Sequence, residues 1–428
     1  MRVLVLGASG FIGAAVCARL VAEGYSVRAG ARRPQAAARR APAGPEWIAA
    51  DFDLMSTSEA WTGALLGIDA VVNCVGVLQD GLGDSSEAAH QTGPAALFEA
   101  CRLSGVRRLI HLSAVGADEA AGTAYARSKL GTEQVLAQSE LDWLVLRPSL
   151  VIGRTVFGGS ALIRGLAGFP GLIPMVGGEQ VFRPVGLEDL AGVIVQCLAP
   201  GGPSRAVLEV AGPEAVSLRD MLVAYRRWLG FAPARVISAP RWAAVPVLKI
   251  GDLLGWLGWA SAFRSTSLRQ MEFDVAGRSS GPSRWTLRPF SALLAEPSGV
   301  QDRWHARLYL VRPLAVAALV LFWLLTGAIA VGPGRDAAER TLETAGLGHF
   351  ASAANLVGST MDIALGLALL FRPWSRSAAL LMAAASLVYL ILGTILAPGL
   401  WGDPLGPWLK ILPMMVLCLF VAATDDRR

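Results

Sequence analysis

Residues 2–13, RVLVLGASGFIG, decide the fold of the N-terminal part of this 428-residue chain. A short buried strand runs straight into a turn in which Gly7, Gly10 and Gly13 have GxxGxxG spacing, and a helical pattern follows to about Glu23. One glycine permits the tight turn, one lets a phosphate approach the backbone, and one lets the helix pack against the strand. The stretch predicts a dinucleotide site at the N-terminus of that helix.

Strand and helix patterns continue to alternate after this unit. We expect further strands over Tyr25–Gly30, Trp47–Ala50, Ala70–Val75, Arg108–Leu112 and Trp143–Leu146. This alternation predicts an α/β fold, a Rossmann-like doubly wound parallel sheet. We expect residues 1–150 to form the NAD(P)-binding core and residues 151–300 a small substrate lobe that returns strands to the sheet edge. In that lobe the Gly- and Pro-rich stretches Gly158–Gly159 and Pro170–Gly178 are expected to be mobile cover loops.

The end of the second predicted strand favours a phosphorylated cofactor. An NAD site would place Asp or Glu there for the ribose 2′-hydroxyl, whereas this chain has Arg28, Arg32 and Arg33. Guanidinium groups suit a 2′-phosphate, so NADP(H) is favoured over NAD(H); a solvated Arg-rich loop is the alternative.

The predicted cofactor-binding set combines the glycine turn, Arg32 and Arg33, and residues at the ends of later strands. It also includes Asp51 and Phe52 after the third strand, which are placed to meet the adenine. Its members are Gly7, Ser9, Gly10, Phe11, Ile12, Gly13, Arg32, Arg33, Asp51, Phe52, Asn73, Cys74, Val75, Gly76, Lys129 and Pro148.

Three residues form the predicted catalytic set: Ser113, Tyr125 and Lys129. Ser113 ends the fifth strand, and the i, i+4 spacing of Tyr125 and Lys129 puts both on one face of a predicted helix. We expect Lys129 to lower the tyrosine pKa and to bond the nicotinamide ribose, Ser113 to orient a substrate carbonyl, and Tyr125 to transfer a proton. YxxxK alone is a weak pattern; its position directly after the fifth strand strengthens it.

The C-terminal part is far more apolar than the rest, which accounts for a hydrophobic fraction of 54%. A membrane span needs about 20 apolar residues, and four segments qualify. They are Leu308–Val331, Phe350–Phe371, Ser377–Leu396 and Leu405–Ala423. Residues 308–424 are therefore predicted to form an all-α bundle of four transmembrane helices.

Arginines mark one side of this bundle. They stand before the first span, between the second and third, and after the fourth: Arg303, Arg307, Arg312, Arg372, Arg376, Arg427 and Arg428. Because Lys and Arg concentrate on the cytoplasmic side, we expect a multi-pass protein of the inner (cytoplasmic) membrane with its Rossmann domain and both termini in the cytoplasm.

Two ionisable residues lie within the apolar segments. Asp362 falls near the middle of the second span and Lys410 about one turn into the fourth. Since such groups usually face a partner, we hypothesise an Asp362–Lys410 pair, either as a lock within the bundle or as a transport or proton site.

A further apolar stretch, Trp242–Phe263, precedes the bundle and carries Trp256 and Trp259. It is either a core helix or, as we expect, a helix at the membrane interface, where tryptophan is common. The second reading would bring the active site to the bilayer and favour a lipophilic substrate, such as a quinone, isoprenoid or sterol-like carbonyl.

With these motifs placed, residues 1 to about 290 resemble the extended and atypical short-chain dehydrogenase/reductases (SDRs), the NAD-dependent epimerase/dehydratase group. Within that group they are similar to the branch of the NADPH-binding accessory subunit of respiratory complex I. The residues that carry the resemblance are Gly7–Gly13, Asn73–Gly76, His111–Ser113, Tyr125–Lys129, Leu146–Ser149, Phe182–Val185, Glu188–Ala191 and Arg264–Met271. The resemblance implies the fold and NADPH binding; members of that branch can hold NADPH as a structural element. The chain departs from many such enzymes in having no Asn near His90–Thr92.

The C-terminal segments resemble the DoxX-like four-helix membrane family. The resemblance rests on Arg312–Pro313, Trp323–Gly327 and Trp401–Lys410, and it implies membrane residence.

Three functions remain open on this reading. The first is an oxidoreductase that uses NADPH on a lipophilic carbonyl or quinone-like substrate; the second is a non-catalytic NADPH-binding structural or redox-sensing module of a membrane complex; the third is a nucleotide-sugar epimerase or dehydratase. The net charge of +5 without a dense basic stretch argues against nucleic acid. Five cysteines without metal-ligand spacing predict buried reduced thiols and no metal site.

Overall fold

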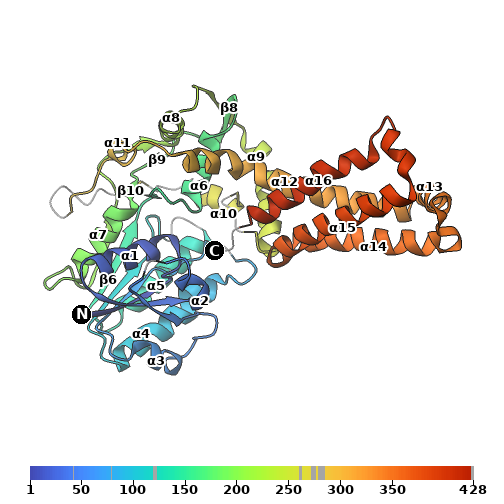
Figure 1. The fold of residues 1–428 in the computed structure, drawn as a ribbon. Coiled ribbons are helices and arrows are strands. Elements are labelled where there is room, and N and C mark those ends of the chain that lie inside the picture. Colours follow the sequence, from blue (N-terminus) through green and yellow to red (C-terminus); the bar gives the residue numbers. More distant parts are fainter. Residues whose placement is uncertain are drawn as a thin grey trace. The chain divides into compact units, whose positions relative to one another are not determined.

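The computed structural model describes residues 1–41, 43–78, 80–118, 123–259, 263–270, 276–277 and 285–425, so the predictions on Met271, Arg427 and Arg428 lie outside the described residues. The chain forms two compact units (Figure 1). One consists of Met1–Trp256 and Ala260–Arg307, and the other of Leu257–Trp259 and Leu308–Arg428.

The first unit is built on a sheet of seven strands in the order β11-β6-β5-β4-β1-β2-β3. The strands are β1 (Arg2–Leu6), β2 (Ser26–Ala31), β3 (Glu46–Ala49), β4 (Ala70–Asn73), β5 (Arg108–Leu112), β6 (Trp143–Pro148) and β11 (Ala206–Val210). All neighbouring strands pair in parallel, which confirms the predicted doubly wound sheet. The strand order reverses between β1 and β4, and ligands bind such sheets in the crevice beyond the carboxyl ends of the strands at that point.

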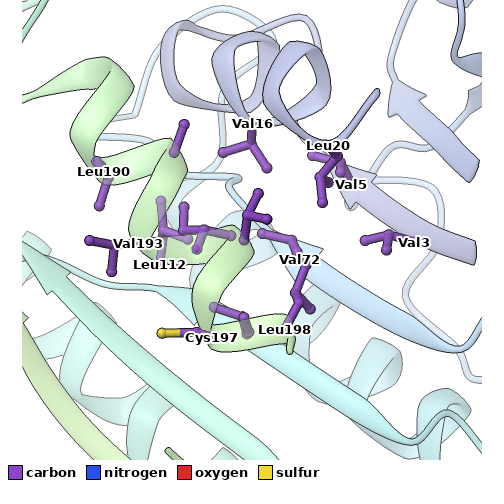
Figure 2. Close-up of a cluster of buried hydrophobic side chains, with 14 of the residues drawn as sticks. Val3, Val5, Val16, Leu20, Val72, Leu112, Leu190, Val193, Cys197 and Leu198 are labelled. Carbon is purple, nitrogen blue, oxygen red and sulfur yellow. The ribbon is translucent and has the colours of Figure 1, made fainter. Parts of the chain in front are cut away.

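Helices cover both faces of this sheet. One face carries α1 (Phe11–Ala22) and α7 (Leu187–Leu198); helices on the other include α3 (Thr62–Leu65), α4 (Gly93–Leu103) and α5 (Ala124–Ala137). Figure 2 shows Val16 and Leu20 of α1, Leu190 and Leu198 of α7, and Val5 and Val72 of the strands as members of one buried cluster. Because both faces are covered, the strands are almost continuously apolar.

The lobe after residue 151 supplies β11 to the sheet edge and several small elements. These are β7 (Val151–Ile152), α6 (Gly159–Ala167), β8 (Leu172–Val176), β9 (Val181–Phe182), β10 (Val185–Gly186), β12 (Val216–Ser217), α8 (Leu218–Trp228), β13 (Arg235–Ala239), α9 (Arg241–Trp256), α10 (Ser265–Gln270) and α11 (Phe290–Leu293).

The lobe corrects the expectation of a mobile cover loop over Pro170–Gly178. Most of that stretch is β8, which pairs in parallel with β13. Ile173 and Met175 are buried in the lobe core, and this alternating burial is a strand pattern that the flanking glycines and prolines obscured in the sequence.

The second unit is helical. It contains α13 (Arg335–Leu342), α14 (Ala351–Leu370), α15 (Ser375–Leu396), α16 (Pro407–Ala423) and most of α12 (Val300–Val331). Among the described residues three stretches are long and apolar enough to cross a membrane: Val300–Val331, Arg335–Leu370 and Arg372–Leu396. The fourth predicted span is an apolar helix of 17 residues, α16, which falls short of that length.

Buried charges gather at one end of this unit. Asp425, just beyond α16, is fully buried and forms ion pairs with Arg312 and Arg372. Ser375 donates to the same carboxylate at 2.8 Å. Arg312 near the start of the first span and Arg372 between the second and third therefore lie at the same end of the bundle as the C-terminus of α16.

The hypothesised pair of Asp362 and Lys410 is wrong. The hydroxyl of Tyr389 on α15 donates to Asp362 on α14 at 2.9 Å, and Lys410 is exposed. The Asp362 carboxylate finds its partner in Tyr389 on α15. Lys410 lies in the first turn of α16, where it is exposed.

Candidate cofactor and catalytic site

The glycine turn stands at the carboxyl end of β1 with the helix very close behind it. Gly7 has a φ of +69°, which favours glycine, and the Gly10 amide donates to its carbonyl at 2.9 Å. A Cβ atom on Gly13 would stand 2.2 Å from the Gly7 oxygen. The first α1 bond runs from Ala14 to Gly10, so the amides of Phe11, Ile12 and Gly13 have no acceptor within the helix. This cradle fits the pyrophosphate of a dinucleotide.

The loop after β4 forms the other wall of the crevice. The buried Asn73 side chain accepts from the Val75 amide at 3.1 Å and lies 3.2 Å from Nδ1 of His111. Cys74 donates from its backbone amide to Leu6 of β1. A Cβ atom on Gly76 would lie 3.4 Å from the Lys129 ammonium, so the absence of a side chain there leaves room between the loop and Lys129.

The predicted catalytic residues occupy the neighbouring strand end and α5. The buried Lys129 ammonium donates to the carbonyl of Leu112, the residue before Ser113, at 3.0 Å. The Ser113 hydroxyl is buried, and within the described part of the chain it has no hydrogen-bond partner. Tyr125 lies one turn before Lys129 on α5 and is half-buried. The structure thus brings Lys129 to the carboxyl end of β5, beside Ser113.

Burial dominates the ionisation of this site. It lowers the pKa of Lys129 to about 8 and raises the pKa of Tyr125 to about 12. The direction for Tyr125 is opposite to the one expected from the sequence. The physical reason is the loss of hydration around the phenol, while the Lys129 ammonium bonds a backbone carbonyl.

His90 is a site residue that the sequence analysis missed. It lies in a single π-helical turn, Ala88–Thr92, where its buried ring accepts from the Val77 amide at Nε2 (3.1 Å) and faces the Ser128 hydroxyl at Nδ1 (2.9 Å). The accepting Nε2 places the ring hydrogen on Nδ1. The ring packs edge-on against Tyr125 at 5.8 Å between centroids. Its pKa is lowered to about 3, first by burial and then by the Lys129 charge.

The sequence signal for His90 is weak, because a lone histidine is more often a satisfied core residue than a site residue. The position near His90–Thr92 stands out in the sequence only by its lack of an Asn.

The three arginines near the end of β2 have different roles. Arg28 is buried and pairs with Glu46 at 3.1 Å, and it also donates to the carbonyl of Ala64 at 2.9 Å. Its guanidinium ties β2 to β3 and α3, so its predicted part in a 2′-phosphate site is wrong. Arg32 is exposed and pairs with Asp84 at 3.0 Å. Arg33 is exposed at the start of α2 (Pro34–Ala38) and, among the described residues, has no ion pair.

The remaining predicted cofactor residues divide by exposure. Phe52 is buried and packs edge-on against Trp61 at 5.3 Å, so its ring belongs to the core. Asp51 is half-buried and accepts from the Asp53 amide at 3.1 Å, Ser9 is exposed, and Pro148 is buried at the end of β6. Asp51 is therefore the member of the pair after β3 whose side chain is available to a ligand.

The cysteines are free thiols, and four of the five are buried. Within the described ranges, no group of three or more His, Cys, Asp and Glu side chains could hold a metal ion.

Two families match separate parts of the chain. Residues 7–164 match the NAD(P)H-binding family, and residues 320–419 match the DoxX-like family. The first stretch contains the glycine turn and α5, and the second contains α14 and α15 together with parts of α12 and α16.

Several relatives are similar to part of this chain. A 3-diazoavenalumate denitrifying reductase of a Streptomyces species is 30% identical over 64% of this chain and 93% of its own length. A ceramide reductase of Caulobacter vibrioides is 24% identical over 46% of this chain and 61% of its own length. The chain spans only 23% of an uncharacterized Mycobacterium tuberculosis protein that is 27% identical over 53% of this chain. It spans 46% of the mitochondrial NADH dehydrogenase (ubiquinone) 1 alpha subcomplex subunit 9 of Arabidopsis thaliana, 26% identical over 40% of this chain.

A solved structure agrees with the fold. The crystal structure of gox2253 superposes with a TM-score of 0.54 at 20% identity over 72% of this chain and 99% of the other. The chain therefore belongs to the NAD(P)H-binding, SDR-like family and carries a C-terminal DoxX-like domain.

Proposed function

We propose that this protein is a membrane-anchored, NADPH-dependent reductase of a lipophilic carbonyl or quinone-like substrate. The observation that carries the proposal is the Lys129 ammonium, which bonds the last carbonyl of β5 next to Ser113, with Tyr125 one turn away on the same helix. A phenol, a cation and a hydroxyl near the strand ends, where this fold binds dinucleotides, support the proposal.

Each residue has a distinct proposed task. A bound nicotinamide dinucleotide would supply hydride to the carbonyl carbon. Tyr125 holds the proton that the carbonyl oxygen needs, and the buried Ser113 hydroxyl orients that oxygen. Lys129, whose pKa of about 8 leaves it mostly charged at neutral pH, stabilises negative charge that develops on the tyrosine oxygen.

The cofactor preference rests on the exposed arginines after β2. Arg33 lacks an ion pair among the described residues and Arg32 has only an exposed one, so both guanidinium groups are available to a 2′-phosphate. We expect NADP(H) to bind more tightly than NAD(H) for this reason.

The substrate class follows from the membrane domain and from the relatives. Two relatives carry reductase names, and one of these names specifies ceramide, a lipid. The described part of the chain has three apolar helices of membrane-spanning length, and a bilayer that holds them also dissolves lipophilic compounds. We propose that the carbonyl substrate comes from the bilayer and that the Rossmann domain faces the cytoplasm, where NADPH is made.

The test uses the full chain in lipid nanodiscs with NADPH and a panel of quinones and long-chain carbonyl compounds. We expect Tyr125→Phe to lower the turnover number about 10²- to 10⁴-fold, because it removes the proton donor. The NADPH and NADH dissociation constants of this variant, measured by fluorescence titration, should match those of the wild type. Tyr25→Phe, which removes a hydroxyl from a half-buried tyrosine of the same unit, is the matched control. Unchanged turnover in Tyr125→Phe would remove the catalytic assignment.

A non-catalytic NADPH-binding module is the second candidate. It is favoured by the similarity to a named respiratory-complex subunit and by the high pKa of Tyr125. Tight NADPH binding without oxidation by any compound of the panel would support this module. A nucleotide-sugar epimerase, the third possibility on the sequence, has no feature of the site that favours it.

A further inference from the structure

Helix α9 exposes large apolar side chains along most of its length. The exposed fractions are 77% for Trp242, 64% for Leu253 and 63% for Trp256. The other exposed apolar side chains on this 16-residue helix include Val245, Val247 and Ile250. Soluble surfaces carry single exposed apolar residues, but a contiguous stripe of this kind marks an interaction surface.

The opposite face of α9 is fixed by glycines. Gly251 and Gly255 are its buried residues, and the carbonyl of Gly255 accepts from the Leu82 amide at 3.4 Å. A Cβ atom on Gly255 would overlap the guanidinium of Arg264, which itself donates to the Asp80 carbonyl at 3.0 Å. The helix is therefore held by its small residues against the loop after β4, with its apolar stripe turned outward.

The residues that directly follow α9 belong to the helical bundle. The carbonyl of Leu257 accepts from the Arg372 amide at 2.9 Å, and the Trp259 indole donates to the Leu370 carbonyl at 2.6 Å. The guanidinium groups of Arg312 and Arg372 lie 5.7 Å and 5.1 Å from the Trp259 ring. Leu257 and Trp259, which directly follow α9 in the sequence, therefore belong to the arginine-bearing end of the bundle.

We infer that α9 lies in the plane of the membrane interface, with its apolar stripe in the lipid headgroup and upper acyl region. Sixteen residues extend about 24 Å, too short a helix to span the hydrocarbon core, and Pro246 interrupts its hydrogen bonds. Trp242 and Trp256 stand at its two ends, as in interfacial helices. Lys249 lies on the exposed side by helical spacing and can extend its ammonium to the headgroups.

We infer that a lipid surface, and not another protein, covers the apolar stripe of α9, because α9 is directly followed in the sequence by residues of the membrane domain. The apolar stripe ends with Trp256, directly before Leu257 of the membrane domain, and this continuity along the chain favours lipid as the phase that covers it.

The placement also gives the proposed reductase a route for its substrate. The loop that α9 holds, Asp80–Leu82, continues from Gly76 and Val77 beside Lys129 and His90. A lipophilic carbonyl could then pass from the interface to the strand ends without crossing bulk water. This consequence rests on the proposed function, whereas the contact between α9 and lipid does not.

Site-directed spin labelling of the full chain in nanodiscs tests the contact without any turnover. Single cysteines replace Val245, Ile250 or Leu253 of α9, and Val223 of α8 is the matched control, because Val223 and Val245 are each 41% exposed. We expect nitroxides on α9 to collide with oxygen several-fold more, and with a water-soluble nickel complex several-fold less, than the nitroxide at Val223→Cys. Wild-type protein taken through the same labelling reaction gives the background signal from its five native cysteines.

Two results would overturn the inference. One is nickel accessibility on α9 equal to that at Val223→Cys in variants that still bind NADPH. The other is dipolar broadening at α9 that vanishes on dilution with unlabelled protein, which would show that a second copy covers the stripe. Both readouts are independent of catalysis, so a failure of α9 to contact lipid and a failure of the reductase proposal remain distinguishable.

Discussion

At the scale of single residues, surroundings decide what a polar side chain does. Arg28 and Arg33 stand five positions apart and have the same chemistry, yet Arg28 is buried among Glu46 and backbone carbonyls while Arg33 is exposed. His90 is fully buried beside Tyr125, whereas His349 is exposed. The same residue type is therefore part of the buried core at one position and available to solvent at another.

His90 gives a prediction for the effect of pH on stability. Its folded pKa of about 3 lies far below the ordinary value near 6.5, so between these values the unfolded chain binds a proton that the native protein does not. Stability from this residue is complete above pH 6.5 and is lost as the pH falls toward 3. His90→Gln should remove that loss, so the difference in free energy of unfolding between wild type and variant should shrink by roughly 1.4 kcal/mol per pH unit below 6.

Denaturant unfolding of detergent-solubilised protein at pH 7, 6 and 5 measures this difference. His349→Gln is the control and should keep the wild-type pH dependence. Curves for wild type and His90→Gln that stay parallel over this range would show that His90 is not held neutral.

At the scale of elements, the close packing of α1 against the turn before it limits which residues the cofactor site can contain. Gly13 is the residue of closest approach, since its Cβ would meet backbone atoms of Gly7 that no rotamer change can move. Gly192 in α7 provides a contrast, because a Cβ there meets nothing within 4 Å. Glycines in two helices of the same sheet face thus have opposite tolerance.

Substitution by alanine should separate these glycines. We expect Gly13→Ala to weaken NADPH binding at least tenfold and to destabilise the protein by about 1–3 kcal/mol, because helix and turn must move apart. Gly192→Ala should leave binding unchanged and stabilise by about 0.4–1 kcal/mol through the unfolded chain. Fluorescence titration and thermal unfolding measure both effects. Wild-type NADPH affinity in Gly13→Ala would show that this packing does not define the site.

At the scale of the whole molecule, buried charge organises one end of the membrane domain. Asp425 gathers Arg312, Arg372 and Ser375 from segments that are more than a hundred residues apart at their extremes. Since arginine concentrates on the cytoplasmic side, we propose that this end faces the cytoplasm and that α13 faces the opposite side.

Cysteine accessibility in intact cells checks this orientation. Ala337→Cys, exposed on α13, should react with a membrane-impermeant maleimide without lysis. Thr62→Cys, exposed in the Rossmann domain, should react only after lysis, and the wild type gives the background of its mostly buried thiols. The reverse pattern would invert the topology.

Features that depend on neighbouring residues could be predicted from the amino-acid sequence. The glycine spacing, the strand–helix alternation and the apolar runs predicted the doubly wound sheet and the helices of the membrane domain, because each signal lies within one segment. Only the tertiary structure decided the roles of Arg28, Phe52 and His90, the strand pairing of β8 and the partner of Asp362. These depend on contacts between segments far apart in the chain, where burial and the local supply of hydrogen-bond partners, not residue type, set the energy.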